Sequence, residues 1–198
     1  MNAGDAVDVA VTCLPSHALV CANGLVSRAA YRHDAPRAFY MLGSIGLAGA
    51  IGLGVALARP ELPVAVFDGD GNVLMGLGAL AMVGDARPEN LLHVVFDNNR
   101  YEGTGGQPSV SGVTALERVA EACGYRRCIR VRGGPADLRS VLVSCGDSRG
   151  PSFVLVECES GYPSGSPRVQ LAPPLIHQRF STYLSQSARF SEGPGELG

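Results

Sequence analysis

The stretch Val64-Ala-Val-Phe-Asp-Gly-Asp-Gly-Asn72 decides the architecture expected for this chain. It begins with four apolar residues, which is typical of a buried strand, and an apolar segment that fits a helix follows over residues 73–86. Between them, two glycines flank Asp70, so the backbone can turn sharply and approach a ligand closely. A strand that turns through glycine into a helix is half of a βαβ unit.

The same alternation of strand and helix continues on both sides of this stretch. Further strands are predicted over residues 18–21, 38–41, 91–97, 128–131 and 153–158. Helices are predicted over residues 3–14, 44–58, 114–123, 136–145 and 175–186, the third opening with a T-x-x-E capping box formed by Thr114 and Glu117. This pattern predicts a three-layer, doubly wound α/β fold with a mostly parallel sheet.

Length and composition favour one domain that works on small molecules. With 198 residues, 46% of them hydrophobic, the chain fits a single domain over residues 1–190 and a disordered tail over 191–198. The net charge of −2 arises without a run of one sign, so we expect no nucleic acid and no membrane surface as partners. There is no signal-like N-terminus and no apolar run of about 18 residues, and the cytoplasm is therefore the expected location.

Two kinds of chemistry are excluded by residue usage. All 16 basic residues are arginine, so no lysine is present to form a Schiff base. The six cysteines contain no C-x-x-C pair and lack zinc or iron–sulfur spacing, which indicates buried thiols. Of the four histidines, His93 lies in an apolar strand and is predicted to be a core residue, while none of the others has a partner at catalytic spacing.

The Gly69-Asp70-Gly71 turn predicts an anion site that also holds a metal. The N-terminus of the following helix offers free N–H groups to a phosphate. Because a carboxylate beside a phosphate is repulsive unless a cation lies between them, Asp70 indicates Mg²⁺ or Ca²⁺. Asn98 follows the next strand, 28 residues after Asp70, which suits one βαβ unit. Octahedral Mg²⁺ would then be held by Asp70, Asn98 and the backbone carbonyl near Arg100.

A Gly-Asp-Gly turn followed at this distance by an Asn pair resembles the signature of thiamine diphosphate-dependent enzymes. The loop Phe39-Tyr-Met-Leu-Gly-Ser-Ile-Gly46 resembles the segment that holds the aminopyrimidine ring in this superfamily. The resemblance implies that the Gly43 carbonyl receives the 4′-amino group, with Ser44 beside it, and that Ile45 wedges the cofactor into a bent shape. Plain core packing is the alternative role of Ile45.

Three further residues are assigned to the cofactor by the same resemblance. Asn23 resembles part of the loop on the diphosphate side, although Asn-Gly is also a common turn. Asn72 is placed to donate to a diphosphate oxygen, and a helix N-cap would look identical. Tyr101 belongs to the Tyr-Glu-Gly-Thr-Gly-Gly-Gln run, whose position after the Asn pair determines which asparagine aligns with the metal ligand of the superfamily. In Asp97-Asn98-Asn99 the usual pair is shifted, so Asn98 is assigned to the metal and Asn99 is the fallback.

Residues 15–185 most resemble the family of phosphonopyruvate decarboxylases and sulfopyruvate decarboxylase beta subunits. The segments FYMLGSIG, GDGNVLMGLGALA, NLLHVVFDNN and YEGTGGQPS carry this resemblance. It implies a ThDP/Mg²⁺-dependent carboxy-lyase subunit that acts on a small 2-oxo acid and releases CO₂ and an aldehyde. No residue of this chain is assigned as catalytic, because the activating glutamate is expected on a partner subunit with a pyrimidine-binding domain, in an α₂β₂ heterotetramer. Glu102 is expected to be a loop carboxylate or an interface contact.

Several alternatives stay open from the sequence. A carboligase that makes an acyloin or acetolactate-type product would share every motif seen here. The beta subunit of a 2-oxo acid ferredoxin oxidoreductase has a similar run after the Asn pair but usually carries cluster-binding cysteines. A non-catalytic stabilising subunit is the third alternative. Arg28, Arg32 and Arg100 are candidate partners for a phosphonate or sulfonate, and pairing with surface carboxylates is their other role.

Overall fold

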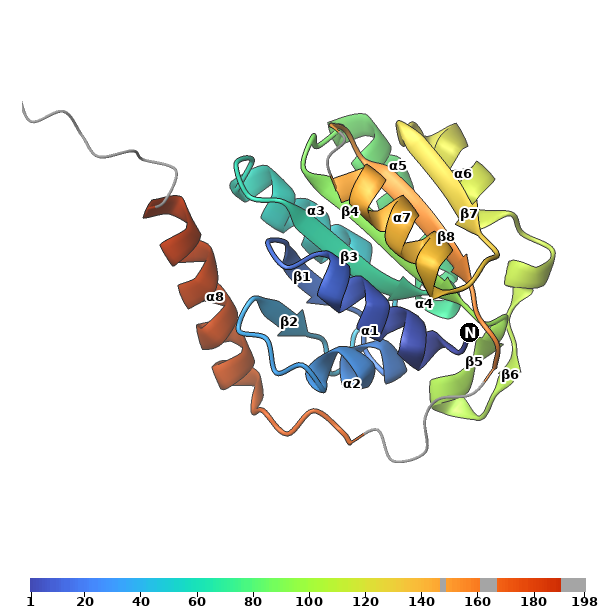
Figure 1. The fold of residues 1–198 in the computed structure, drawn as a ribbon, viewed down its shortest axis with the longest axis horizontal. Coiled ribbons are helices and arrows are strands. Elements are labelled where there is room, and N and C mark those ends of the chain that lie inside the picture. The colour runs from blue at the N-terminus through green and yellow to red at the C-terminus, as the bar shows by residue number, and fades with distance from the viewer. Residues whose placement is uncertain (147–148, 161–166, 190–198) are drawn as a thin grey trace, which may run out of the picture.

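A sheet of six parallel strands runs through the middle of the molecule in the order β2-β1-β3-β4-β8-β7 (Figure 1). The computed structural model describes residues 1–146, 149–160 and 167–189. The strands are β1 (Ala18–Cys21), β2 (Ala38–Tyr40), β3 (Val64–Gly69), β4 (Leu91–Asp97), β7 (Arg127–Val131) and β8 (Ser152–Glu157). The predicted fold class is confirmed. The predicted tail lies outside the described residues, and so does most of the loop after residue 160.

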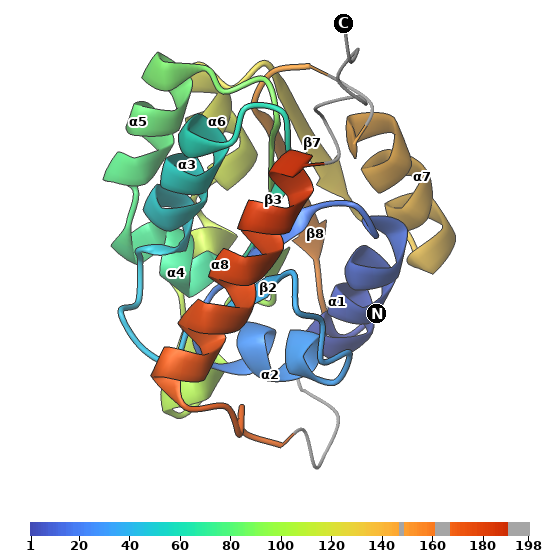
Figure 2. The same cartoon turned by 90° about the vertical axis from the view of Figure 1, so that its left-hand side faces the viewer.

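Helices cover both faces of this sheet, as the turned view in Figure 2 shows. One face carries α1 (Ala3–Cys13), α2 (Leu25–Tyr31) and α7 (Pro135–Gly146), and the other carries α3 (Ala48–Ala58), α5 (Gly78–Ala86) and α6 (Leu116–Cys123). Side chains of β4 divide between the two cores, with Leu92 and Val94 on the first face and Leu91 and Val95 on the second. Burial on both faces explains why the central strands are continuously apolar.

The C-terminal helix α8 (Pro173–Arg189) packs along the edge strand β2. Phe180 is 6% exposed, and its ring lies 5.7 Å from the ring of Phe39 on β2. Arg179 also binds the carboxylate of Asp34, in the turn before β2, at 2.7 Å. The helix therefore covers an edge that would otherwise be open to pairing with another chain.

The strand order places a switch point between β1 and β3. From β1 the chain continues outward to β2 and then returns to β3, on the other side of β1, before it proceeds to β4. In doubly wound sheets, ligands bind outside the carboxyl ends of the strands at this position, because the two following loops diverge there and leave a crevice. The loop that begins at Ala22 and the start of α4 (Asp70–Met75) border this crevice.

The prediction of one continuous helix over residues 73–86 is wrong. The structure has α4 (Asp70–Met75) and α5, separated by Gly76 and Leu77. The break occurs because Gly76 lies against the loop before α3, where a Cβ on Gly76 would be 2.0 Å from the carbonyl oxygen of Gly46. The helix predicted from residue 44 accordingly starts only at Ala48, since Ser44 and Gly46 have positive φ angles of 63° and 91°.

The prediction of a capping box formed by Thr114 and Glu117 is also wrong. Ala115 occupies the N-cap position of α6 and makes no side-chain capping bond, whereas Glu117 pairs with Arg130 on β7 at 2.6 Å. Helix α2 and a small hairpin formed by β5 (Arg100–Tyr101) and β6 (Gln107–Pro108) were not predicted. Both elements are short, and their sequences carry little periodicity.

The prediction for His93 is confirmed. Its ring is 1% exposed, with Nδ1 at 3.1 Å from the Tyr125 hydroxyl and Nε2 at 3.3 Å from the Asp68 carboxylate. The prediction for the cysteines is correct only for Cys21 and Cys145, because the other four are partly exposed, and none of the six, all of which lie in the described residues, forms a disulfide. Within the described parts of the chain, no helix combines the length and apolar character needed to cross a membrane.

Two helix-interior glycines provide a test of the packing on the second face. A Cβ on Gly84 would lie 1.7 Å from the carbonyl oxygen of Cys123, whereas a Cβ on Gly54 would meet nothing within 4 Å. We expect Gly84→Ala to lower the free energy of unfolding by about 3 kcal/mol, because backbone must move. Gly54→Ala should raise it by about 0.5–1 kcal/mol through helix propensity. Equal effects of the two substitutions in urea unfolding would contradict the close contact of α5 with Cys123.

Candidate functional site

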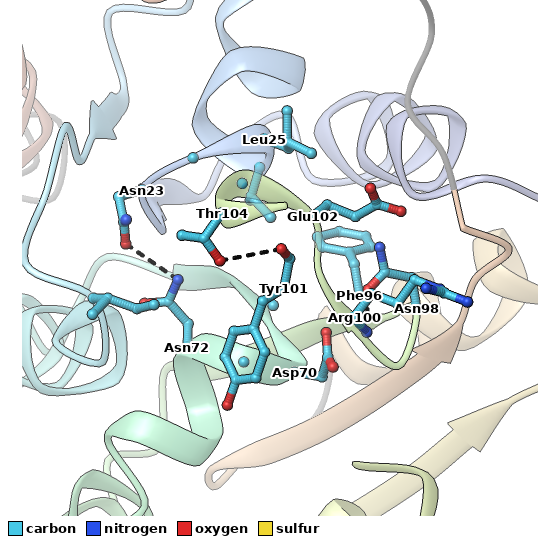
Figure 3. A pocket seen from close by; sticks show the side chains of 16 residues that line it. Asn23, Leu25, Asp70, Asn72, Phe96, Asn98, Arg100, Tyr101, Glu102 and Thr104 are labelled. Atoms are coloured by element: carbon cyan, nitrogen blue, oxygen red, sulfur yellow. Dashed lines mark hydrogen bonds between the residues drawn. The ribbon is translucent and has the colours of Figure 1, made fainter. Parts of the chain in front are cut away.

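A cavity of about 150 Å³ lies at the carboxyl ends of β1, β3 and β4, at the switch point of the sheet (Figure 3). Most of the residues that the sequence analysis assigned to a cofactor or metal line it. They are Asn23, Ile45, Gly69, Asp70, Gly71, Asn72, Asn98, Arg100 and Tyr101. Segments that are up to 78 residues apart in the sequence therefore converge on one place, as the parallel topology predicts.

Asp70 is the first residue of α4, and its carboxylate is 2% exposed. Burial raises the pKa of Asp70 above its usual value, and the nearby Asp97 carboxylate adds to this, whereas hydrogen bonds from Ser109 and Ser111 act in the opposite direction. Among the described residues no arginine or histidine forms an ion pair with Asp70. A buried carboxylate that has neutral hydrogen-bond donors but no cationic partner is well suited to bind a cation.

The donors around Asp70 are oxygens. Asn98 is 7% exposed, lines the cavity, and accepts a hydrogen bond from the Arg100 backbone N–H at 3.1 Å through its Oδ1 atom. In the part of the chain that is described, no group of three His, Cys, Asp or Glu side chains could hold a metal. A metal at this place would depend on Asp70, an amide oxygen and backbone carbonyls, a donor set that suits Mg²⁺.

Asn99, the fallback ligand, is placed differently from Asn98. It has a positive φ of 58° and does not line the cavity, and its Oδ1 atom lies 3.1 Å from the Ser111 hydroxyl. The Arg100 side chain donates to the Gly106 carbonyl at 2.7 Å, which closes the hairpin loop. The geometry therefore favours the register in which Asn98 faces the cavity.

Asn72 connects three loops at the cavity wall. Its Oδ1 atom accepts a hydrogen bond from the Gly46 N–H at 2.7 Å, and its Nδ2 atom donates to Oδ1 of Asn23 at 3.2 Å (Figure 3). Asn72 lies inside α4, whose N-cap is Gly69, so the N-cap alternative for Asn72 is wrong. The amide holds the loops after β1, β2 and β3 in a common arrangement.

The second glycine of the turn is required by Tyr101. A Cβ on Gly71 would lie 2.5 Å from the Tyr101 ring, so this ring packs directly on the backbone at the start of α4. The contact joins the loop after β4 to the turn after β3. A Cβ on Gly69, in contrast, would meet nothing within 4 Å. Gly69 is the N-cap of α4.

Gly43 and Ser44 line an adjacent apolar groove rather than the cavity itself. Ile45 lines the cavity and is 41% exposed, so the core-packing alternative for Ile45 is wrong. Its neighbours Leu42 and Leu47 are 52% and 50% exposed, and Met75 is 62% exposed on the segment that contacts Gly46. We call these exposed side chains, together with Leu77, the apolar rim.

Sequence reasoning missed a pair of serines at the floor of the site. The hydroxyls of Ser109 and Ser111 both lie within hydrogen-bonding distance of Oδ2 of Asp70, and Ser111 also lies 2.8 Å from Oδ1 of Asp97. The available signal was the Ser-Val-Ser triplet directly after the Gly-Gly-Gln-Pro run. Glu102 is half-buried and lines the cavity, from the hairpin loop next to Arg100.

The three candidate arginines have different surroundings. Arg32 pairs with Asp8, and Arg100 closes its own loop. Arg28 has no side-chain hydrogen bond or ion pair with any described residue, and with Arg168 it lines a second cavity that shares Asn23 and Gly24 with the first. Arg28 is thus the candidate that remains available for an anion.

Comparisons with known proteins agree with this geometry. Residues 20–156 match the family model of the thiamine pyrophosphate enzymes, C-terminal TPP binding domain, and thiamine pyrophosphate is the same compound as thiamine diphosphate. A solved structure from Mycobacterium smegmatis, described as a thiamin diphosphate-dependent enzyme, superposes with a TM-score of 0.66 at 18% identity. The superposition covers 81% of this chain and 32% of the Mycobacterium smegmatis chain. At this identity the similarity supports the fold alone.

Curated relatives are more similar in sequence. A phosphonopyruvate decarboxylase of Streptomyces viridochromogenes is 40% identical over 91% of this chain and 45% of its own length, so this chain spans about half of that relative. A sulfopyruvate decarboxylase subunit beta of Methanococcus maripaludis is 38% identical over 85% of this chain and 89% of its own length. The chain therefore belongs to the thiamine pyrophosphate enzymes and corresponds to their C-terminal, TPP-binding domain.

Proposed function

We propose that this chain is the diphosphate-binding subunit of a ThDP/Mg²⁺-dependent decarboxylase that converts a small anionic 2-oxo acid into CO₂ and an aldehyde. The observation that carries the proposal is the convergence of Asp70 and Asn98 on one cavity at the switch point of the sheet. When bound, the cofactor supplies the electron sink for decarboxylation. The similarity to phosphonopyruvate and sulfopyruvate decarboxylases supports this reaction over carboligation.

The residues of the cavity divide into three groups by role. Asp70, Asn98 and the backbone carbonyl of Arg100 hold Mg²⁺, which neutralises the repulsion between the Asp70 carboxylate and the diphosphate. Asn23, Asn72 and the backbone at Gly69 and Gly71 contact the diphosphate, and Tyr101 holds the start of α4 in place through its contact with Gly71. Gly43, Ser44 and Ile45 bind the aminopyrimidine ring, for which the neighbouring apolar groove offers space.

A partner subunit completes the site. A cavity of about 150 Å³ is smaller than the ~300–1,000 Å³ of complete small-molecule sites, so another surface is needed to enclose the cofactor. Ile45 of the apolar rim lines the cavity, and the rim as a whole offers exposed side chains that a protein partner would bury. Relatives named as beta subunits agree with this assembly. We therefore infer a pyrimidine-binding partner that supplies the activating glutamate, in an α₂β₂ tetramer.

The substrate is a short 2-oxo acid with a second anionic group. Arg28 supports this choice, because its guanidinium has no partner among the described residues and lines a cavity that adjoins the cofactor site. Two relatives act, according to their names, on phosphonopyruvate and sulfopyruvate. Arginine binds such planar or tetrahedral oxyanions through paired N–H donors.

Product analysis tests the reaction. The chain and its partner subunit should release CO₂ and the corresponding aldehyde from phosphonopyruvate or sulfopyruvate, and only when thiamine diphosphate and Mg²⁺ are both supplied. An acceptor aldehyde added to the assay should leave this product unchanged. Formation of an acyloin in its place would identify a carboligase, and failure to bind thiamine diphosphate in calorimetry would disprove the proposal as a whole.

Removal of the Asp70 carboxylate tests the metal assignment. We expect Asp70→Ala to weaken Mg²⁺-dependent binding of thiamine diphosphate more than about 100-fold, since the one carboxylate of the metal site is lost. The unfolding temperature of the metal-free chain should not fall much, because the substitution also removes a buried charge. Asp85→Ala, an exposed aspartate on α5, is the matched control. Unchanged cofactor affinity of Asp70→Ala would exclude the assignment.

Substitution of Arg28 tests the substrate class. Arg28→Gln should raise KM for an anionic 2-oxo acid about tenfold or more, with little change in kcat, because one charge-assisted contact to the substrate is lost. KM for pyruvate, which lacks a second anionic group, should stay the same. Arg118→Gln, on the exposed face of α6, serves as the control. Equal KM changes for both substrates would show that Arg28 does not select the anionic group.

A further inference from the structure

Two serine hydroxyls connect the two loops that carry the proposed metal ligands. Ser109 follows β6, and Ser111 lies in the short 3₁₀ turn Val110–Gly112. Both hydroxyls bind Oδ2 of Asp70, with Ser111 at 3.2 Å, and they lie 2.9 Å from each other. The turn is thereby attached to the start of α4.

Ser111 also reaches the loop that contains Asn98. Its hydroxyl lies 2.8 Å from Oδ1 of Asp97 and 3.1 Å from Oδ1 of Asn99, the residues on either side of Asn98. Asp97 in turn accepts the backbone N–H of Asn99 at 3.0 Å, and the Ser109 N–H donates to the Asn99 carbonyl at 2.9 Å. The segment with Ser109 and Ser111, which we call the serine turn, therefore contacts Asp70 itself and the residues on both sides of Asn98.

The pattern of contacts favours one orientation of Asp70. Because the two hydroxyls engage the same oxygen, Oδ2, they restrict rotation of the carboxylate and leave Oδ1 to other partners. Ser111 is 4% exposed, so water does not compete freely for its hydroxyl. Hydrogen bonds to an ionised acceptor in such a place are among the strong ones.

Ser111 carries a single hydroxyl hydrogen but lies within bonding distance of two carboxylates. It can donate to Asp70 or to Asp97, and the other carboxylate then lacks this donor. Because Ser109 also donates to Oδ2 of Asp70, Asp70 keeps one hydroxyl donor when Ser111 donates to Asp97. The two serines together can therefore hold Asp70 and the loop with Asn98 at the same time.

We propose that Ser109 and Ser111 are positioning residues of the metal site, which orient Asp70 and Asn98 together and so determine the affinity for Mg²⁺. The inference rests on the metal role proposed for Asp70 and Asn98. Neither serine lines the cavity, so both act through the ligands and not by contact with the cofactor.

Calorimetric titration of Mg²⁺ tests the inference, with the full chain and its partner subunit at saturating thiamine diphosphate. Ser109→Ala and Ser111→Ala should each raise the half-saturating Mg²⁺ concentration about tenfold or more, and excess Mg²⁺ should restore cofactor binding and kcat. Ser109→Thr keeps the hydroxyl and should stay within about twofold of wild type. Ser152→Ala is the control, because it removes a buried hydroxyl at the opposite, amino-terminal end of β8.

Three results would overturn the inference. The first is a half-saturating Mg²⁺ concentration that is the same in both alanine variants as in the wild type. The second is a loss of cofactor binding that excess Mg²⁺ does not restore. The third is a half-saturating Mg²⁺ concentration that rises equally in Ser152→Ala. The second and third would indicate general damage to the fold, which thermal unfolding of the metal-free variants would reveal independently. A wild-type chain that binds no thiamine diphosphate at any Mg²⁺ concentration would instead disprove the proposed function itself.

Discussion

A buried carboxylate without a basic partner is the constraint around which this site is organised. Asp70 is 2% exposed, and among the described residues it receives hydrogen bonds from hydroxyl groups but no ion pair. Such a charge is costly to bury unless a cation or additional donors compensate it. Asn98, the serine turn and the hairpin after β4 lie around Asp70, where they can supply these donors or help to hold a cation.

Close backbone packing brings these surroundings together. The contact of Gly76 with Gly46 ends α4 after six residues and brings the loop with Gly43, Ser44 and Ile45 beside the turn with Asp70. Asn72 then connects that loop with Asn23 through two hydrogen bonds. The interruption of the expected long helix is therefore part of the site, and it depends on Gly76, because any side chain at that position would separate the two backbones.

The lining of the cavity differs in character from the surface beside it. Polar side chains such as Asp70 and Asn98 line the cavity, whereas the apolar rim, with Ile45 and Met75 at 41% and 62% exposure, is exposed. Relatives named as beta subunits and a match to one domain of the thiamine pyrophosphate enzymes agree with a chain that supplies half of a binding site. The physical reason for the division is that a cofactor held only from one side stays in water, where its charges are screened.

The sequence by itself determined the fold class, the six strands and most of the residues that line the cavity. It could do so because apolar runs, glycine turns and the position of a loop after a parallel strand are local properties whose consequence is general. Tertiary structure alone decided the break after Met75 and the replacement of the Thr114 cap by the pairing of Glu117 with Arg130. It also revealed Ser109 and Ser111. Each of these depends on contacts between segments distant in sequence, whose distances no local pattern encodes.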